Sequence, residues 1–213
     1  MRPRLISFEG GEGCGKSTQL GLLVQRLQSA GQTVVTLREP GGTEVGEVIR
    51  DLLKHHPAGH GMSAETELLL FAASRAELVR KRIVPALEAG QWVVCDRFLD
   101  STTVYQGIAR GLEAESVAAI NRFAIAGHTP GLTLVLDTDP AEARERMRLR
   151  DGEKADRMES EPMDFYHRVA GGFRNLAAQN PDRIRLVPAS GPVGEVAQSV
   201  LKEFRHAFPG VLD

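Results

Sequence analysis

Residues 10–17 constrain the fold of this chain more than any other segment. They form the sequence Gly-Gly-Glu-Gly-Cys-Gly-Lys-Ser, with four residues between Gly10 and the triplet Gly15-Lys16-Ser17. This spacing is typical of a loop that wraps around phosphate groups. A short apolar run precedes it at residues 5–8, and an amphipathic helical pattern follows at residues 20–30. The sequence therefore predicts a buried strand, a phosphate-binding loop and a helix, in that order.

The residue types in this loop suit a nucleotide. Glycines allow backbone amides to approach phosphate oxygens closely, and the start of the following helix adds a partial positive charge. Lys16 supplies a cation for the β- and γ-phosphates, and Ser17 supplies a hydroxyl for Mg²⁺. Cys14 is interpreted as a small residue that fills the loop, since no histidine lies near it in the sequence to activate a thiol. We assign nucleotide binding to Gly10, Gly11, Glu12, Gly13, Cys14, Gly15, Lys16, Ser17 and Thr18.

Composition narrows the class of protein. The 213 residues, of which 42% are hydrophobic and 25% charged, suit one globular α/β domain. A net charge of −2 gives no electrostatic reason to expect nucleic-acid binding. We expect no membrane span, because the longest apolar run covers only residues 68–73, and no signal peptide, because the first strand begins almost at once. Two cysteines make no disulfide framework, and we expect a cytoplasmic protein.

Strand-like and helical patterns alternate along the chain. Apolar strand patterns occur at residues 5–8, 33–37, 91–96, 132–137 and 184–187. Helical patterns occur at residues 20–30, 45–53, 63–89, 113–126 and 140–150, and again around residues 165–176 and 196–204. Alternation of this kind predicts a five-stranded parallel sheet with helices on both faces, a doubly wound three-layer α/β fold.

Charged residues follow two of the predicted strands. Asp96 ends the third strand, where a carboxylate can complete a Mg²⁺–nucleotide site, and Arg97 comes next as a candidate for binding phosphate. The two could simply pair with each other, but a buried strand end is a costly place for two charges. The second strand leads into Arg38-Glu39-Pro40-Gly41-Gly42-Thr43, which we expect to face the substrate; an ordinary solvated connection is the alternative.

Further polar and aromatic residues could recognise a base. Phe71 and Arg75 are four residues apart on one predicted helix, so one could stack on a flat ring and the other bind its edge. A core phenylalanine with a surface arginine is the alternative. The segment that contains Ser101, Thr102, Tyr105 and Gln106 supplies hydroxyls, a ring and an amide, although a polar helix start would have the same composition.

An arginine-rich segment follows the fourth strand. Arg144, Arg146, Arg148 and Arg150 lie on one predicted helix, and a very polar stretch continues to Arg157. We expect a lid at approximately residues 146–160 that closes over phosphates; a solvated charged helix and loop is the alternative. A GTPase would need Asp-x-x-Gly and Asn-Lys-x-Asp segments, which this sequence lacks. A second anion site and a lid favour a kinase that acts on a small molecule.

Several of these segments together resemble the thymidylate kinase family, in its bacterial form. They are Phe8-Glu9-Gly10 with the glycine-rich loop, residues 38–43, Asp96-Arg97-Phe98, and residues 101–107. The resemblance extends over essentially the whole chain. It implies a P-loop NTPase-type fold and transfer of the γ-phosphoryl group of ATP to dTMP with Mg²⁺, by a homodimer that serves DNA-precursor synthesis. The alternatives are another nucleoside monophosphate kinase or, more distantly, a nucleotide-binding module without catalytic activity.

The resemblance also assigns roles to individual positions. Phe71 would stack on thymine and Arg75 would bind its carbonyl edge, while Arg97, with Arg38 or Arg50, would hold the dTMP phosphate. Gly13 occupies a place where some family members carry an arginine, and in those that do not the lid supplies the charge. The lid candidates are Arg148, Arg150 and Arg157, among which we select Arg150. The implied catalytic residues are Lys16, Glu12, Arg97 and Arg150. The implied substrate-binding residues are Glu39, Pro40, Arg50, Phe71, Arg75, Arg97, Ser101, Thr102, Tyr105 and Gln106, and the implied Mg²⁺ ligands are Ser17 and Asp96.

Overall fold

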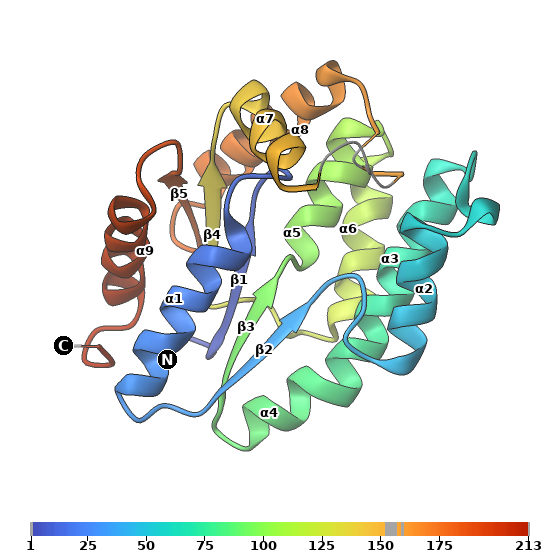
Figure 1. Ribbon diagram of the computed structural model, residues 1–213. Helices are drawn as coiled ribbons and strands as arrows, with labels where there is room; N and C mark the ends of the chain where they lie inside the picture. Colours follow the sequence, from blue (N-terminus) through green and yellow to red (C-terminus); the bar gives the residue numbers. More distant parts are fainter. Residues whose placement is uncertain (1, 152–156, 159, 213) are drawn as a thin grey trace.

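Five parallel strands form one sheet in the order β2-β3-β1-β4-β5, with helices on both faces (Figure 1). The computed structural model describes residues 2–151, 157, 158 and 160–212, and of Arg150 and Asp151 it describes only the backbone. The strands are β1 (Leu5–Glu9), β2 (Val34–Arg38), β3 (Trp92–Asp96), β4 (Leu132–Asp137) and β5 (Ile184–Pro188). The predicted five-stranded parallel sheet is confirmed, and each strand boundary lies within one residue of the expected position.

Helices connect the strands and cover the sheet. They are α1 (Lys16–Ser29), α2 (Glu44–Lys54), α3 (Ala64–Leu78), α4 (Val84–Glu88), α5 (Leu99–Thr102), α6 (Ala114–Ile125), α7 (Pro140–Asp151), α8 (Met163–Gln179) and α9 (Val193–Ala207). A short 3-10 helix, η1 (Pro57–Gly59), follows α2, and two π-helical segments, η2 (Val79–Ile83) and η3 (Thr103–Ala109), follow α3 and α5. None of the helices in the described part of the chain has the length and apolar character that crossing a membrane requires.

The three central strands, β3, β1 and β4, are buried on both faces, as their apolar sequences require. Side chains alternate along a strand, so Ile6 and Phe8 pack with residues of α1 and α9, while Leu5 packs on the other face with η2 and α4. Strands covered on both sides need nearly continuous apolar sequence, because neither face reaches water. β1 is therefore fully buried along its length.

The strand order places the phosphate-binding loop in the middle of the sheet. β1 pairs with β3 on one side and with β4 on the other. In an open parallel sheet, the carboxyl ends of strands that lead away in opposite directions leave a crevice between their loops, and ligands bind there. The loop between β1 and α1 lies at this position, next to the carboxyl end of β3, where Asp96 and Arg97 occur.

Two helical predictions differ from the structure in detail. The helix expected over residues 63–89 is interrupted by the π-helical segment η2, just before Pro85, which has no N–H to donate to an earlier carbonyl. Leu69, an apolar residue within this helical pattern, is 56% exposed. The polar segment 101–107 is helical, in α5 and η3, and a helical segment can still present these side chains to a ligand.

Candidate active site

The loop between β1 and α1 is closely packed around its backbone. Gly10 has φ +130°, and a Cβ there would lie 2.5 Å from the carbonyl oxygen of Leu136. Gly13 has φ +75°, and a Cβ there would overlap the carbonyl oxygen of Ala143 on α7. Only glycine satisfies both the positive φ and the close approach. The glycines therefore let α7 and the end of β4 lie directly against the phosphate-binding loop.

Lys16 is the first residue of α1, and its side chain turns back across the loop. Its ammonium group donates to the carbonyl oxygens of Gly11 at 2.7 Å and Gly10 at 3.4 Å. The residue is 7% exposed. This conformation holds a cation inside the loop, at the end of a helix whose amino terminus also favours anions.

Ser17 and Asp96 meet at the carboxyl edge of the sheet. The Ser17 hydroxyl donates to Asp96 Oδ2 at 2.9 Å. A hydroxyl and a carboxylate are hard oxygen ligands of the kind Mg²⁺ prefers, and this ion usually takes its remaining ligands from water and nucleotide phosphates. The described residues include no group of three or more His, Cys, Asp and Glu side chains that could hold a metal alone. The pair therefore fits an ion that arrives with a nucleotide.

Arg97 and Glu12 form an ion pair in front of the loop. Arg97 Nη2 lies 2.9 Å from Glu12 Oε1, and Arg97 Nη1 donates to the Gly10 carbonyl at 3.0 Å and to Ser101 Oγ at 2.9 Å. The guanidinium also lies over the ring of Tyr105, 5.0 Å from its centre. Burial alone would raise the pKa of Glu12, but the charges of Arg97, Lys16 and Lys54 outweigh it and hold that pKa well below its usual range. Glu12 is therefore a carboxylate at neutral pH.

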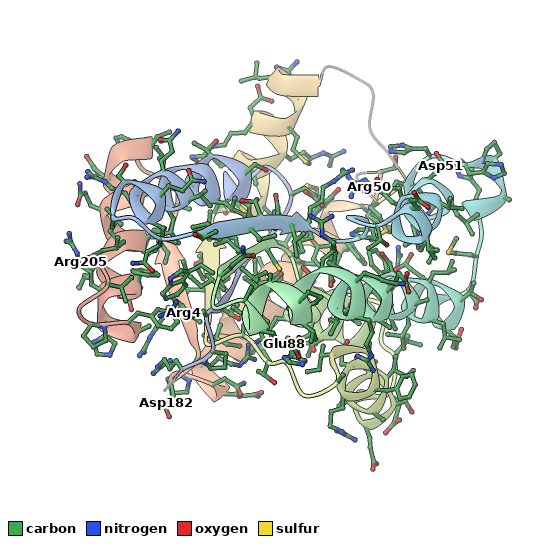
Figure 2. The ribbon with its side chains drawn as sticks, turned by 90° about the horizontal axis from the view of Figure 1, so that it is seen from below. Arg4, Arg50, Asp51, Glu88, Asp182 and Arg205 are labelled. Carbon is green, nitrogen blue, oxygen red and sulfur yellow. The ribbon has the colours of Figure 1, made fainter. Side chains whose placement is uncertain are left out.

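A polar cavity of about 400 Å³ opens between the loop and α2. We call it the phosphate cavity. Its lining consists of Glu12, Gly13, Gly15, Lys16, Ser17, Thr18, Arg38, Glu39, Arg50, Lys54, Asp96, Arg97 and Arg146. In Figure 2, Arg50 lies beyond the tip of the β2 arrow, and its guanidinium donates to the Pro40 carbonyl at 2.9 Å. Basic side chains from separate elements thus converge on one cavity, which suits a polyanionic ligand.

A smaller pocket of about 50 Å³ adjoins the phosphate cavity. We call it the base pocket. Its lining consists of Glu12, Glu39, Pro40, Lys54, Phe71, Arg97, Ser101, Thr102, Tyr105, Gln106 and Met158. Four of these residues, Glu12, Glu39, Lys54 and Arg97, also line the phosphate cavity. The two spaces are therefore neighbours, one largely charged and the other with aromatic and amide side chains.

The structure brings most of the expected substrate-binding residues to these two spaces, but it keeps Arg75 behind them. Arg75 is 1% exposed and lines neither space, so a surface position is wrong for it. Its guanidinium pairs with Glu39 at 2.6 Å and donates to Thr102 Oγ1 at 2.9 Å and Asn121 Oδ1 at 2.8 Å. Glu39 and Thr102 do line the base pocket, so Arg75 supports its wall from below.

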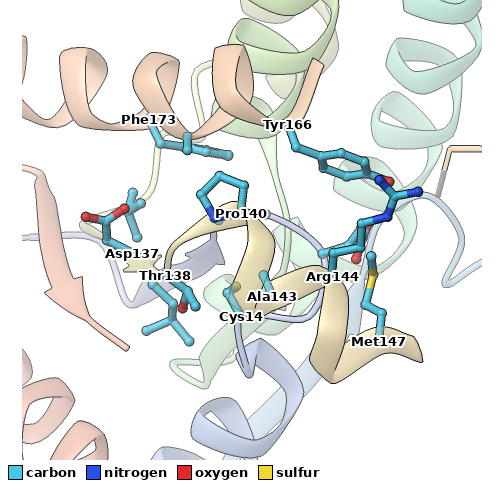
Figure 3. Close-up of a pocket in the computed structure, with 15 residues that line it drawn as sticks. Cys14, Asp137, Thr138, Pro140, Ala143, Arg144, Met147, Tyr166 and Phe173 are labelled. Carbon is cyan, nitrogen blue, oxygen red and sulfur yellow. The ribbon is translucent and has the colours of Figure 1, made fainter. Parts of the chain in front are cut away.

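Another cavity lies behind the loop, beneath α7 (Figure 3). Its volume of about 20 Å³ has room for about one water molecule. Cys14 faces it together with Pro140, Ala143 and Phe173. Cys14 is 3% exposed and packs within the core cluster beneath α1, which agrees with its interpretation as a residue that fills the loop.

Three lining residues were not assigned to the site individually, although Arg146 and Met158 lie within the expected lid range. Lys54 ends α2, one turn after Arg50, and that i, i+4 spacing was the available signal. Arg146 donates to the carbonyls of Ala189 at 3.1 Å and Ser190 at 3.4 Å, so α7 contacts the segment after β5. Met158 lies in a charged segment whose sequence gives no indication of a pocket position.

The lid arginines have different surroundings. Arg148 is exposed and pairs with Glu145 at 2.8 Å on the same helix. Arg157 pairs with Glu67 of α3 at 2.7 Å and donates to the Leu53 carbonyl at 2.7 Å. The side chain of Arg150, and residues 152–156 and 159 of the expected lid, lie outside the described residues. In the described part of the segment, Arg157 fastens the chain to α2 and α3.

The sheet order, the loop at its centre and the two adjoining spaces define a P-loop nucleotide kinase. The protein-family model described as thymidylate kinase matches residues 8–200. The thymidylate kinase of Synechococcus sp. (strain JA-2-3B'a(2-13)) is 50% identical over 192 residues, covering 90% of this chain and 89% of that protein. The thymidylate kinase of Pelotomaculum thermopropionicum is 47% identical over 212 residues, covering 100% and 97%.

A solved structure agrees with these relatives. The crystal structure of thymidylate kinase from Ehrlichia chaffeensis superimposes with a TM-score of 0.76 at 33% identity, covering 94% of this chain and 97% of that one. The chain belongs to the thymidylate kinase family.

Proposed function

We propose that this protein transfers the γ-phosphoryl group of ATP to dTMP in nucleotide biosynthesis. In the reaction, a phosphate oxygen of dTMP attacks the γ-phosphorus of ATP, and the bond from that phosphorus to the β,γ-bridging oxygen breaks. The products are dTDP and ADP, and no covalent intermediate on the protein is needed. Family membership supports this activity, because the matching relatives are thymidylate kinases over nearly their whole length.

The observation that carries the proposal is the junction between the phosphate cavity and the base pocket. Glu12 and Arg97 line both spaces, so groups bound in the two spaces would meet there. Phosphoryl transfer depends mainly on positioning the reacting groups and on stabilising the charge of the transition state. Lys16, held in the loop, would brace the β- and γ-phosphates, and Arg97 would hold the phosphate of the acceptor. Glu12 holds the guanidinium of Arg97 in place through their 2.9 Å contact.

The base pocket would receive the thymine. Phe71 offers a ring face for stacking, and Tyr105 and Gln106 offer polar groups at its wall. Ser101 and Thr102 would line the base and sugar, and Glu39 and Pro40 would close the side toward β2. Arg50, with Arg38, would add positive charge around the dTMP phosphate. Arg75 would act on the thymine edge indirectly, because it holds Glu39 and Thr102 in place. A direct contact between Arg75 and thymine would require Glu39 and Thr102 to move aside.

The donor side would hold ATP with Mg²⁺. Gly10, Gly11, Gly13 and Gly15 expose loop backbone to the phosphates, with Cys14 packed beneath and Thr18 at the start of α1. Ser17 and Asp96 would hold Mg²⁺, which when bound to the nucleotide neutralises part of the phosphate charge. The segment after β5, which Arg146 contacts, would lie beside adenine.

We further propose that the chain is a single domain whose residues at approximately 146–160 act as a lid. Arg150 would approach the transferring phosphoryl group, since Gly13 leaves no cation on the loop side at that position. We also propose that two copies form a homodimer, and that the protein works in the cytoplasm, where ATP and dTMP are available and its two free cysteines stay reduced.

An ADP-release assay with the full chain, ATP and MgCl₂ tests the activity. A panel of dTMP, dUMP, dCMP, dGMP and GMP is expected to give the highest kcat/KM with dTMP. Lys16→Ala is the control, and should lower turnover by about a hundredfold or more while the protein stays folded, because it removes a cation from the transition state. Preference for dCMP or GMP would indicate another nucleoside monophosphate kinase. Nucleotide binding without turnover of any monophosphate would indicate a binding module.

A further inference from the structure

A buried carboxylate beneath the base pocket has no role in the mechanism described above. Glu67 lies on α3, is 1% exposed and lines neither the base pocket nor the phosphate cavity. It accepts a hydrogen bond from Gln106 Nε2 at 2.8 Å and two from Arg110 at 3.2 Å, and it pairs with Arg157 at 2.7 Å. Gln106, Arg110 and Arg157 thus all present donors to the Glu67 carboxylate.

The two arginines keep this carboxylate ionised. Burial by itself would raise the pKa of Glu67, but the hydrogen bonds from Arg110 and Gln106 and the charge of Arg110 hold that pKa below its usual value. An ionised carboxylate can only accept hydrogen bonds. It therefore takes the NH₂ group of Gln106 and excludes the carbonyl oxygen of the same amide, which would place two acceptors against each other.

The hydrogen bond between Gln106 Nε2 and Glu67 determines which end of the Gln106 amide is available to a ligand. Gln106 is 2% exposed and lines the base pocket. Its Nε2 uses one hydrogen to bond Glu67, whereas its Oε1 has no hydrogen-bond partner among the described residues. The pocket that Gln106 lines can therefore be offered a carbonyl oxygen that no described residue uses, which is an acceptor.

We propose that Glu67 is a positioning residue for base selection, which orients Gln106 so that the pocket accepts a pyrimidine carrying a ring N–H. Thymine and uracil have a hydrogen on N3, which can donate to Gln106 Oε1. Cytosine has a lone pair on N3, which would face that oxygen without a hydrogen between them. A site built to pair with a ligand's hydrogen rejects an analogue that leaves the buried group unpaired. This inference rests on the proposed function and specifies how one edge of its substrate is recognised.

Glu67 also contacts residues other than Gln106, and these contacts would be expected even if its role were purely structural. Through Arg157 it fastens the described end of the lid segment to α3, and through Arg110 it reaches Glu161 at 2.6 Å. Loss of this fastening would lower turnover for every acceptor alike. The test must therefore separate a change in selectivity from a general loss.

The test compares dTMP with 5-methyl-dCMP, which share the sugar, the phosphate and the 5-methyl group and differ at positions 3 and 4 of the ring. Glu67→Gln removes the obligatory acceptor, since a glutamine can donate to Gln106 Oε1 and so allow its amide to turn. We expect the ratio of kcat/KM for dTMP over 5-methyl-dCMP to fall about tenfold or more, mainly through a higher KM for dTMP.

Two variants serve as controls in the same cluster. Glu161→Gln removes a partner of Arg110 that does not touch Gln106, and should leave the ratio within about twofold of wild type, as expected for a partly exposed pair. Arg157→Ala removes the lid contact, and should lower turnover with both substrates together. An unchanged ratio in Glu67→Gln, with both rates reduced equally, would overturn the proposal. Absence of dTMP turnover in the wild type would instead refute the proposed function.

A measurement on the wild-type protein decides the matter if Glu67→Gln does not fold. The N3 imino proton of 15N-labelled dTMP, bound to the protein, should be protected from exchange with water and visible by NMR, because it donates to a protein oxygen. Replacement of Gln106 by Leu should remove that protection. An imino proton that exchanges as rapidly in the complex as in free dTMP would contradict an acceptor at this position.

Discussion

Arg97 has a backbone conformation that its neighbours must maintain. Its φ is +70°, in the left-handed region that residues other than glycine seldom adopt. Arg97 N donates to the Phe8 carbonyl at 2.9 Å, and the next amide, Phe98 N, donates to Glu9 Oε1 at 2.8 Å. Such conformations persist where surrounding contacts determine them. Glu9, fully buried at the end of β1, is thus a support for the arginine that joins the two ligand spaces.

The first prediction concerns the pH dependence that Glu9 gives to stability. Burial, followed by the charge of Asp100, raises the pKa of Glu9 from 4.5 to about 8. The folded protein then holds a proton that the unfolded chain releases at lower pH, so Glu9 should lower the free energy of unfolding as pH rises from about 4.5 to about 8. In Glu9→Gln this contribution is absent. Urea titrations at pH 5, 6.5 and 8 should show the wild type losing stability relative to the variant.

Glu65→Gln is the matched control, because it removes one negative charge from an exposed position on α3. The difference in the free energy of unfolding between wild type and Glu9→Gln should grow with pH. The corresponding difference between wild type and Glu65→Gln should not grow in the same way. Equal slopes for all three proteins would show that Glu9 does not titrate in this range. Activity of Glu9→Gln at pH 7 then reports separately on the support of Arg97.

At the scale of single residues, the sequence predicts the local placement of side chains well and their distant pairing poorly. Lys16, Ser17 and Asp96 follow motifs whose geometry is nearly fixed by the strand, loop and helix around them. Arg75 is different. Its partners Glu39 and Asn121 are 36 and 46 residues away, so no local pattern indicates that its guanidinium is buried and fully engaged. Glu67 likewise has distant partners, Gln106 and Arg110, which are 39 and 43 residues away.

At the scale of elements, α7 and the phosphate-binding loop form one packed unit. A Cβ on Gly13 would overlap Ala143 of α7 and approach Met147 Cγ to 2.9 Å. The sequence indicates that position 13 lacks a charge found in some family members, and the structure adds a steric reason why this chain cannot carry a larger residue there. A side chain at position 13 therefore requires α7 to lie elsewhere.

The second prediction follows for Gly13→Ala. The substitution combines a positive φ with a backbone clash, so α7 must move away from the loop. We expect kcat/KM to fall about tenfold or more, since small displacements of positioned groups cost rates of that order. Circular dichroism should remain that of a folded protein. Gly21→Ala in α1 is the control, because its Cβ would meet nothing within 4 Å. Wild-type activity in Gly13→Ala would show that α7 has no role in positioning the loop.

Element boundaries were predictable where one periodicity continues without interruption. The strands are short apolar runs between turns, and their positions agree with the sequence to within a residue. The helix over residues 63–89 has a π-helical segment, in which an extra residue shifts the phase of every later side chain. Periodicity averaged over the whole stretch hides such a shift.

At the scale of the whole molecule, large apolar side chains remain exposed on neighbouring helices. Phe123 on α6 is 81% exposed, Leu69 on α3 is 56% exposed, and Val45 and Val48 on α2 are 54% and 72% exposed. α2 packs against α3, and α3 packs against α6, on the side of the molecule opposite α9 (Figure 1). Exposed apolar groups gathered on packed helices are typical of a surface that a partner covers. This supports the proposed homodimer, with α2, α3 and α6 as the face that a second copy covers.

The last prediction tests that face with Phe123→Glu. A carboxylate in the centre of an apolar contact between two copies would meet its symmetry mate and lose water on association, so the dimer should dissociate. Light scattering after size exclusion should give about twice the chain mass of 23.2 kDa for the wild type and the single mass for the variant. Leu186→Glu, on the edge strand β5 and 40% exposed, introduces the same charge away from this face and should leave the mass doubled.

The α2–α3 helices carry Arg50, Lys54 and Phe71 into the site, so monomeric Phe123→Glu should also show a raised KM for dTMP. A wild type that elutes with the mass of one chain would contradict the proposed dimer, and dissociation by Leu186→Glu instead would place the contact elsewhere.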